Sequence, residues 1–299
     1  MTTKTRSWLI TLVILASPFL LFLSFLLFWD AERLPPLAPL PNPNGYDFFL
    51  NAGKMAANNS RQAERMNEAQ LRDLVEKNAK ALSLSRAGFS NQCQVPLQYS
   101  VAYWDTHLEE SGCLRRLARA FIAEGRLAEM ENRNVDAAGS FLDIIHLSDK
   151  SAHGGLLIDE LVAGDMGALG TTHLQKLVPR LDARTCRETA ATLQSLDSEA
   201  ETWNTIMQQE KVWRTVYARL QRRKISALEA RLQKDLDSSC ELKFNWQKQQ
   251  TRQLMVNLAV HAYELEKGHP PASIADLVPA YLKAVPQDPV TGTNLVYSP

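Results

Sequence analysis

The chain has 299 residues, and its 33 lysine and arginine residues balance 33 aspartate and glutamate residues, giving a formal net charge of zero. That balance excludes the basic surface of a nucleic-acid-binding protein, so we expect no nucleic-acid partner. None of the four cysteines has Cys-x-x-Cys spacing, which argues against zinc and thioredoxin-like sites. Disulfides and free thiols both stay open for Cys93, Cys113, Cys186 and Cys240.

The first predicted element is an uncharged run of 22 residues from Trp8 to Trp29. At a rise of about 1.5 Å per residue, such a helix crosses a hydrocarbon layer of about 30 Å. Lys4 and Arg6 precede the run, and positive residues stay on the cytoplasmic side. We therefore predict a single-pass anchor in the lipid bilayer of the inner (cytoplasmic) membrane, with the N-terminus inside and residues 30–299 extracytoplasmic.

Two other interpretations of this run stay open: a cleaved signal peptide, and a helix buried wholly within protein. A signal peptide has an apolar region of roughly 7–15 residues followed by a small-x-small cleavage site. The run found here is longer and ends in Phe28-Trp29-Asp30-Ala31-Glu32, which offers no such site. An uncleaved anchor is therefore the preferred prediction.

The composition predicts a mainly α fold, made of the N-terminal transmembrane helix and an extracytoplasmic helical-bundle domain. A proline-rich tether joins the two, and a short C-terminal helix with a turn and strand module closes the chain. The predicted parts are a cytoplasmic stub (1–7), the anchor (8–29), the tether (30–44), the helical domain (45–268) and the C-terminal module (269–299).

Apolar residues at three- and four-residue spacing predict a series of helices in the domain. The first helix begins near Tyr46, is capped by Asn44 and carries an apolar stripe of Tyr46, Phe49, Leu50 and Met55. The next predicted helices are Glu68–Arg86, about Trp104 to Leu127, and Val135–Ala152. A helix over 156–178 then ends at Pro179, and Ala183–Leu196 follows with Asp182 or Thr185 as its cap.

Two long helices follow, at Glu199–Asp237 and Glu241–Lys267, and Gly268 is the expected stop of the second. The first carries a stripe that is typical of a buried or coiled-coil face. Its members are Trp203, Ile206, Met207, Trp213, Val216, Tyr217, Leu220, Leu228, Leu232 and Leu236.

One pair of helices resembles a single tetratricopeptide unit. The matching residues are Phe121, Gly125, Ala128, Ala137, Phe141 and Ile144. Asp149 stands where that family favours proline, and no companion unit occurs 34 residues away in either direction. The resemblance implies a helical hairpin, because an array needs about three repeats.

The C-terminal stretch resembles the segment after the long helix of the type II secretion major pseudopilin. The matching residues are Tyr263, Gly268, Pro270 or Pro271, Leu277, Pro279, Tyr281, Leu282, Val285, Pro286, Asp288, Pro289, Gly292 and Tyr297. Ser7–Phe28 has neither the glycine nor the glutamate of that family's N-terminus, and the family's calcium loop lies beyond this segment. The chain as a whole resembles uncharacterised bacterial membrane-anchored helical proteins that share this ending, so we expect a packing module, in which Ser273 begins a short helix and Asn294–Tyr297 forms an edge strand.

Few residues point to chemistry. His146, Asp149 and His153 share one helix face and are weak candidates for a metal site, because no fourth ligand has diagnostic spacing. Asp159 and Glu160 lie in an apolar helix, but adjacent helical residues point in different directions and cannot share a proton. Gly164, Gly167 and Gly170 lack the lysine of a phosphate loop, and close helix packing explains them better.

The sequence therefore predicts no catalytic residue, metal or cofactor, and an enzyme is the less favoured class. The leading hypothesis is a non-catalytic, membrane-anchored helical protein that binds a protein partner or organises the envelope. Two alternatives stay open. One is an envelope hydrolase that uses dispersed histidines and carboxylates, and the other is an accessory of a pseudopilin-like secretion apparatus.

Overall fold

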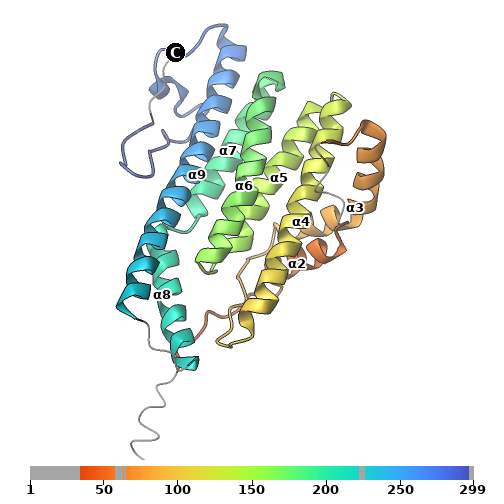
Figure 1. Cartoon of the computed structure of the whole chain (residues 1–299). Coiled ribbons are helices and arrows are strands. Elements are labelled where there is room, and N and C mark those ends of the chain that lie inside the picture. The colour runs from red at the N-terminus through yellow and green to blue at the C-terminus, as the bar shows by residue number, and fades with distance from the viewer. Residues whose placement is uncertain (1–33, 58–62, 64, 222–225, 296–299) are drawn as a thin grey trace, which may run out of the picture. The chain divides into compact units, whose positions relative to one another are not determined.

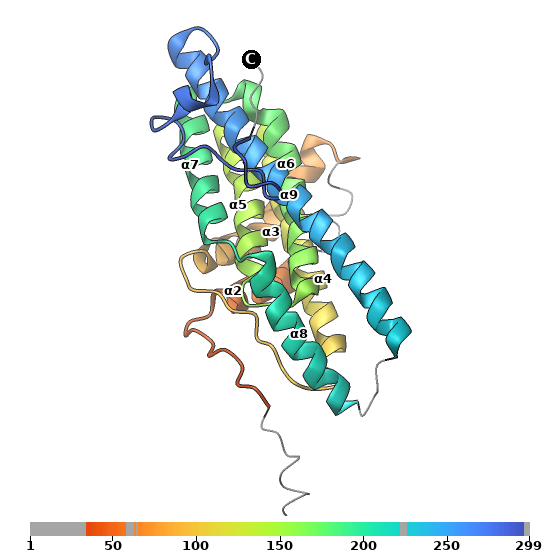
Figure 2. The ribbon, with the colours of Figure 1, turned by 90° about the vertical axis from the view of Figure 1, so that its left-hand side faces the viewer.

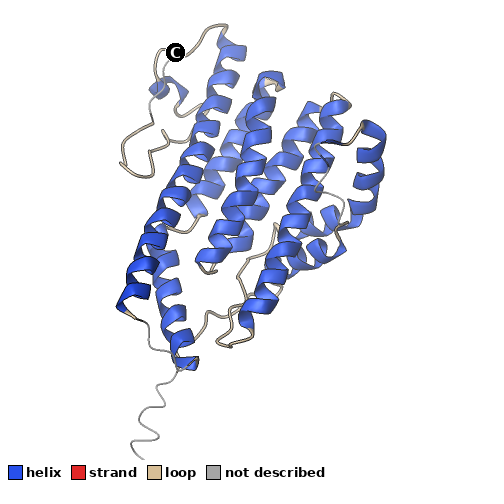
Figure 3. Ribbon diagram, in the orientation of Figure 1, coloured by secondary structure: helices blue, strands red, loops and turns tan. Residues whose placement is uncertain are grey.

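A computed structural model describes residues 34–57, 63, 65–221 and 226–295 (Figure 1). This part of the chain is mainly helical, as predicted, and all of its helices belong to the compact unit Ala38–Pro299 (Figure 3). Its elements are α2 (Gly45–Met55), α3 (Glu68–Gly88), α4 (Tyr103–Met130), α5 (Asn134–Ala152), α6 (Leu157–Leu177), η2 (Val178–Arg180), α7 (Ala183–Glu199), α8 (Trp203–Leu220), α9 (Ala227–Lys267) and η3 (Ile274–Leu277).

The predicted anchor, Trp8–Trp29, lies outside the described residues, as does the cytoplasmic stub. Among the helices that the structure does describe, none combines the length and the apolar character needed to span a bilayer. The compact unit begins at Ala38, so the last residues of the predicted tether belong to it. Asn44 joins them to the body by donating its side-chain amide to the carbonyl of Gln94 at 2.8 Å.

Several helix ends follow the predicted caps. The side chain of Asn44 accepts from the backbone of Tyr46, and that of Asp182 accepts from the backbone of Thr185. Gly268 ends α9 with φ 78°, a left-handed conformation that glycine adopts without a Cβ penalty. These local hydrogen bonds fix where α2, α7 and α9 begin or end.

One continuous apolar core holds the body together. Helix α5 packs between α4 and α6, α6 packs on α9, and α7 packs on both α5 and α9. Its largest fully buried side chains include Tyr46, Phe49, Phe121 and Phe141. The predicted stripe of α2 is confirmed at Tyr46, Phe49 and Leu50, whereas the prediction for Met55 is wrong, because this last residue of the helix is 51% exposed.

The tetratricopeptide-like pair forms a hairpin of α4 and α5, joined by three residues. At their contact, a Cβ on Gly125 would lie 2.8 Å from the ring carbon Cδ1 of Phe141, closer than real Cβ atoms come. The absence of a side chain at Gly125 therefore lets the Phe141 ring pack closely against α4. The glycine of the predicted unit has a packing role.

The prediction of a helix over Glu199–Asp237 is wrong. Glu199 ends α7, Thr202 caps α8, and α9 starts at Ala227 and continues without a break through residues 238–241. Ser226 and Glu229 form a capping box, in which each side chain bonds the other's backbone amide. The apolar periodicity continues across this cap and hides it in the sequence.

The C-terminal module packs against α7 and α9. Leu277, Tyr281 and Leu282 are buried in the main core, and the Tyr281 hydroxyl donates to Glu266 of α9 at 2.7 Å. Ser273 caps η3 as predicted. The predicted edge strand is wrong over its described residues, where only an isolated bridge joins Gln287 to Asn294.

Candidate functional site

An acidic pocket lies between α5, α6, α7 and α9. Its volume is about 140 Å³, close to that of a cavity which holds one small organic molecule. The apolar part of its wall includes Ile145, Leu193, Leu196 and Phe244. The polar part consists of Asp149, His153, Glu160, Asp197, Glu201, Gln247, Lys248 and Thr251. Four carboxyl groups and one lysine therefore line the same small space.

Small residues of α6 bring the walls of this pocket together. A Cβ on Gly164 would collide with the Gln247 amide of α9, and a Cβ on Gly167 would lie 2.8 Å from Oγ of Ser148 on α5. Ser148 also donates its hydroxyl to the carbonyl of Ala163 at 2.7 Å. The predicted packing role of these glycines is confirmed, and the close approach places α5 and α9 on either side of Glu160.

Two of the carboxyl groups accept hydrogen bonds. Asp197 accepts from Nε of Arg252 at 2.9 Å and lies 3.9 Å from Nζ of Lys248. Glu201 accepts from the backbone amide of Gly154 at 3.2 Å, and its other oxygen lies 3.8 Å from Nδ1 of His153. The partners of Asp197 are cations, whereas the imidazole and amide beside Glu201 bring no permanent charge.

Glu160 has no hydrogen bond or ion pair to its carboxyl group from the residues that the structure describes. The residue keeps an intermediate exposure because the pocket opens onto it, so its carboxyl group is partly rather than fully buried. This burial raises the pKa of Glu160 to about 8, and the carboxylates of Glu201 and Asp149 add to the rise. At neutral pH, Glu160 is therefore mostly protonated.

Asp149 lies on the α5 side of the pocket. Burial raises its pKa to about 6, although Lys150, 3.9 Å away, opposes the rise. Two carboxyl groups whose pKa values lie near neutrality sit in one cavity and respond to any charge that enters it.

The predicted face of His146, Asp149 and His153 does not act as a unit. Asp149 and His153 line the pocket, whereas the His146 ring stacks on Phe89 with 4.2 Å between ring centroids. Burial lowers the pKa of His146 to about 4. Among the described residues, no three His, Cys, Asp or Glu side chains are placed to hold one metal ion.

His107 lies in the interior, where its side chain is 1% exposed. Its Nε2 contacts Oδ1 of Asp159 at 2.7 Å, and Nδ1 lies 3.5 Å from Glu110. Burial lowers the pKa of His107, but the hydrogen bond with Asp159 and the charge of Glu110 outweigh it and raise the pKa to about 9. Asp159 thus points to the core and Glu160 to the pocket, as expected for adjacent helical residues.

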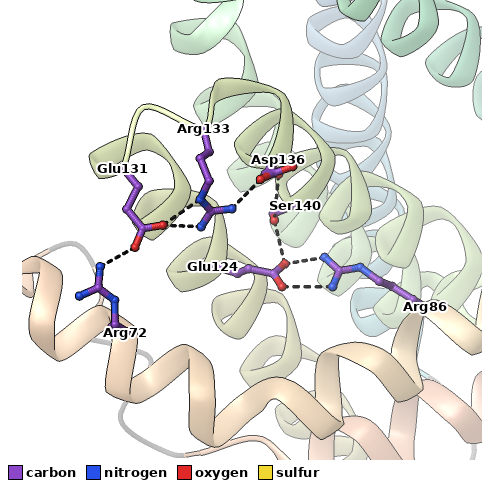
Figure 4. A network of polar contacts seen from close by, with 7 residues as sticks. All are labelled: Arg72, Arg86, Glu124, Glu131, Arg133, Asp136 and Ser140. Carbon is purple, nitrogen blue, oxygen red and sulfur yellow. Dashed lines mark hydrogen bonds and ion pairs between the residues drawn. The ribbon is translucent and has the colours of Figure 1, made fainter.

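A second charged cluster joins α3 to the α4–α5 hairpin (Figure 4). Arg86 of α3 pairs with Glu124 of α4 and, at 2.7 Å, with Asp143 of α5. Ser140 donates to the same Glu124 at 2.7 Å. Because these charges satisfy one another, the cluster has a structural role. The residues drawn are Arg72, Arg86, Glu124, Glu131, Arg133, Asp136 and Ser140.

The first half of α9 exposes large apolar side chains, and its first buried residue is Leu254. Figure 2 shows this half extending away from the helices that pack around α5. We call its exposed apolar residues the α9 stripe: Leu228 (66% exposed), Leu232 (54%), Leu236 (58%), Leu242 (70%) and Trp246 (55%). Of the two alternatives predicted for this stripe, a buried face is wrong for Leu228, Leu232 and Leu236 within the single chain, and a coiled-coil face stays a prediction.

All four cysteines are free thiols in this structure. Burial raises the pKa of Cys93 to about 11 and that of Cys186 to about 12. A reactive cysteine needs a depressed pKa, so neither thiol has the character of a nucleophile.

Sequence reasoning singled out Asp149, His153 and Glu160 of the pocket but missed Asp197, Glu201 and Lys248. Lys248 lies on α9, about a hundred residues after Asp149, and no local spacing connects them. The apolar surroundings of Glu160 in the sequence were the one available signal. Comparison with protein-family models, curated proteins and solved structures finds no match for this chain.

Proposed function

We propose that this protein is a non-catalytic, membrane-anchored extracytoplasmic protein that acts by binding protein through the α9 stripe. The observation that carries the proposal is the exposure of five large apolar side chains on a helical segment with no buried residue of its own. A contiguous exposed apolar face marks an interaction site. A partner helix would both cover the face and stabilise the segment.

The distribution of the histidines supports a non-catalytic role. His107 is buried against Asp159, His146 stacks on Phe89, and only His153 reaches the pocket. An envelope hydrolase would need a base and an acid directed at one reacting atom. We propose the binding role over the hydrolase on this ground.

The packing of the C-terminal module bears on the secretion-accessory alternative. Its apolar residues Leu277, Tyr281 and Leu282 are used inside the body. A fibre subunit would need comparable surface free for its neighbours. We propose that the segment is a packing module.

The partner that we propose is a second copy of this chain, paired in antiparallel orientation. In the α9 stripe, Leu228 and Trp246 lie nine residues before and after Asp237, and Leu232 and Leu242 lie five residues before and after it. All four fall on one side of a helix that turns about 100° per residue. Antiparallel pairing centred on Asp237 would therefore place Leu228 against Trp246 and Leu232 against Leu242 in both halves.

The membrane anchor gives this pairing a physical rationale. Each stripe residue would bury on the order of 100 Å², or about 500 Å² per copy, whereas a stable interface buries about 800 Å² per partner. Pairing of free bodies in solution is then weak. Holding both copies on one membrane raises their effective concentration, as linking two binding modules does.

Site-specific photo-crosslinking in the full-length, membrane-bound protein tests the proposal. A benzophenone amino acid at Leu232 should give a crosslinked dimer, with the crosslink mapping by mass spectrometry to residues 239–246 of the second copy. Glu241 is the matched control position. It is exposed and lies nine residues after Leu232, so its side chain points to the opposite side of the helix. Crosslinking mainly to lipid, or equally from both positions, would contradict a protein-binding stripe, and capture of a different protein would overturn self-pairing.

A further inference from the structure

We infer that the acidic pocket between α5, α6, α7 and α9 binds a primary ammonium group, carried by a small alkylamine or by a lysine side chain. The inference is independent of the proposed function, because it rests on Asp149, Glu160 and Asp197. Phe244 and Lys248 of α9 also line the pocket and flank Trp246 of the α9 stripe in sequence, but at about 100° per residue they point to the other side of the helix. Its foundation is a cavity of about 140 Å³ into which an unpartnered carboxyl group opens.

The charges of the pocket favour a cation. Arg252 and Lys248 accompany Asp197, but Glu160 has no partner and Glu201 has only a backbone amide and an imidazole nearby. A partly buried carboxyl group without a hydrogen bond from the protein offers an acceptor to a donor that enters the pocket. A primary ammonium brings three donors and a positive charge that would balance Glu160 once this carboxyl group ionises.

The geometry favours an organic cation over a metal ion. Calcium needs six to eight oxygen ligands at about 2.3–2.6 Å, and the described residues hold no group of three side chains placed for a metal. An ammonium group bonds at about 2.8 Å and accepts oxygens that are farther apart. Lys248 already illustrates the chemistry, since its Nζ lies 5.6 Å from the Phe244 ring centroid and 3.9 Å from Asp197.

The size and the walls limit the rest of the ligand. A cavity of about 150 Å³ holds a molecule as large as benzene, so about six heavy atoms fit beside Lys248. Ile145, Leu193, Leu196 and Phe244 give an apolar surface for the carbon chain. A short unbranched alkylamine or the end of a lysine side chain meets both limits.

Binding of the cation should release a proton. The pKa of Glu160 is raised to about 8 by burial and by neighbouring carboxylates, and an ammonium beside it favours the ionised form. An alkylammonium, with a pKa of about 10.4, keeps its charge up to pH 9. Affinity should therefore rise with pH as Glu160 ionises. The charged groups that act on Glu160 are Glu201, Asp149, Asp159 and Lys248. His153 on the α5 side and Asp197 on α7 line the same pocket.

Calorimetric titration of the full-length protein in detergent micelles with butylamine hydrochloride provides the test. We expect the affinity to rise at least tenfold from pH 6 to pH 8.5, and protons to be released near pH 7, detected as a dependence of the heat on the buffer's ionisation enthalpy. 1-Butanol, which has the chain without the charge, should bind at least tenfold more weakly. A lysine peptide with blocked termini that binds tighter than butylamine would assign the ammonium to a protein side chain; the reverse would assign it to a free amine.

Glu160→Gln keeps the shape of the side chain and removes its ionisation. This variant should lose most of the pH dependence and bind butylamine about tenfold more weakly at pH 8.5. Glu188→Gln is the control, because Glu188 is an exposed α7 residue outside the pocket. Equal binding of butylamine and butanol, or an unchanged pH profile in Glu160→Gln, would overturn the inference. Circular dichroism of each variant establishes that it is folded. If a variant does not fold, comparing butylamine with butanol on the wild-type protein still tests whether binding depends on the charge.

Discussion

The buried ion pair of His107 and Asp159 constrains the body at the residue scale. Asp159 accepts from His107 at 2.7 Å through one oxygen and from the backbone amide of Leu156 at 2.7 Å through the other. The pair joins α4 to the first turn of α6. Removing one charge from such a pair costs about 3–5 kcal/mol, because the other charge stays buried without compensation.

This pair predicts a pH dependence of stability. The folded-state pKa of His107 is raised to about 9 from its usual 6.5, so the stabilisation is complete below pH 6.5 and is lost as pH rises to about 9. Asp159→Asn keeps an acceptor for Leu156 but removes the charge. We expect it to lower the free energy of unfolding by about 3–5 kcal/mol at pH 6 and to flatten its decline between pH 6.5 and 9, measured by urea denaturation.

His153→Gln serves as the control for Asp159→Asn, because His153 is a histidine whose side chain is 47% exposed. It should change the free energy of unfolding by less than about 0.5 kcal/mol. An Asp159→Asn variant that keeps the full decline above pH 6.5 would show that His107 is not the titrating group.

Helix α4 carries two glycines with opposite packing environments. Gly125 lies against the Phe141 ring of α5, whereas a Cβ at Gly112 would meet no atom within 4 Å. Gly125→Ala should destabilise the protein by about 1–3 kcal/mol, because overpacking pushes α4 and α5 apart. Gly112→Ala should stabilise it by about 0.5–1 kcal/mol through the higher helix propensity of alanine. Thermal denaturation of both variants measures the two effects, and a shift of the same sign in both would contradict the packing explanation.

The helices differ in how well sequence predicts them, and the contacts explain why. The α4–α5 hairpin was predictable because its determinants, Gly125 and Phe141, belong to a local pattern. The start of α9 was not, because the leucines at 228, 232 and 236 continue the periodicity of α8 although no helix of the body covers them. Periodicity indicates a face that excludes water, and it does not identify what covers that face.

At the scale of the whole molecule, local sequence patterns could predict only part of the acidic pocket. Asp149 and His153 share a predicted helix face, and that much was visible in the sequence. To bring them to Glu201 and Lys248, α6 must pack very closely against both α5 and α9. Gly164 and Gly167 permit this approach because they have no Cβ atom. The site is a consequence of packing among four elements, so its charge balance became apparent only from the fold.

The proposed membrane anchor would determine which compartment the pocket and the α9 stripe face. Inserting about 20 apolar residues into lipid is favourable, and under this proposal Lys4 and Arg6 would hold the N-terminus inside. Trypsin added to intact spheroplasts should therefore digest the body, whereas inside-out vesicles should protect it. Deleting residues 8–29 should leave the body in the cytosol and protected in spheroplasts. Survival of the wild-type body in spheroplasts, or mass spectrometry showing a trimmed product free of the membrane, would contradict this topology. Either result would also remove the membrane concentration on which weak pairing through the α9 stripe depends, whereas the ammonium pocket, which needs only the folded body, would stand.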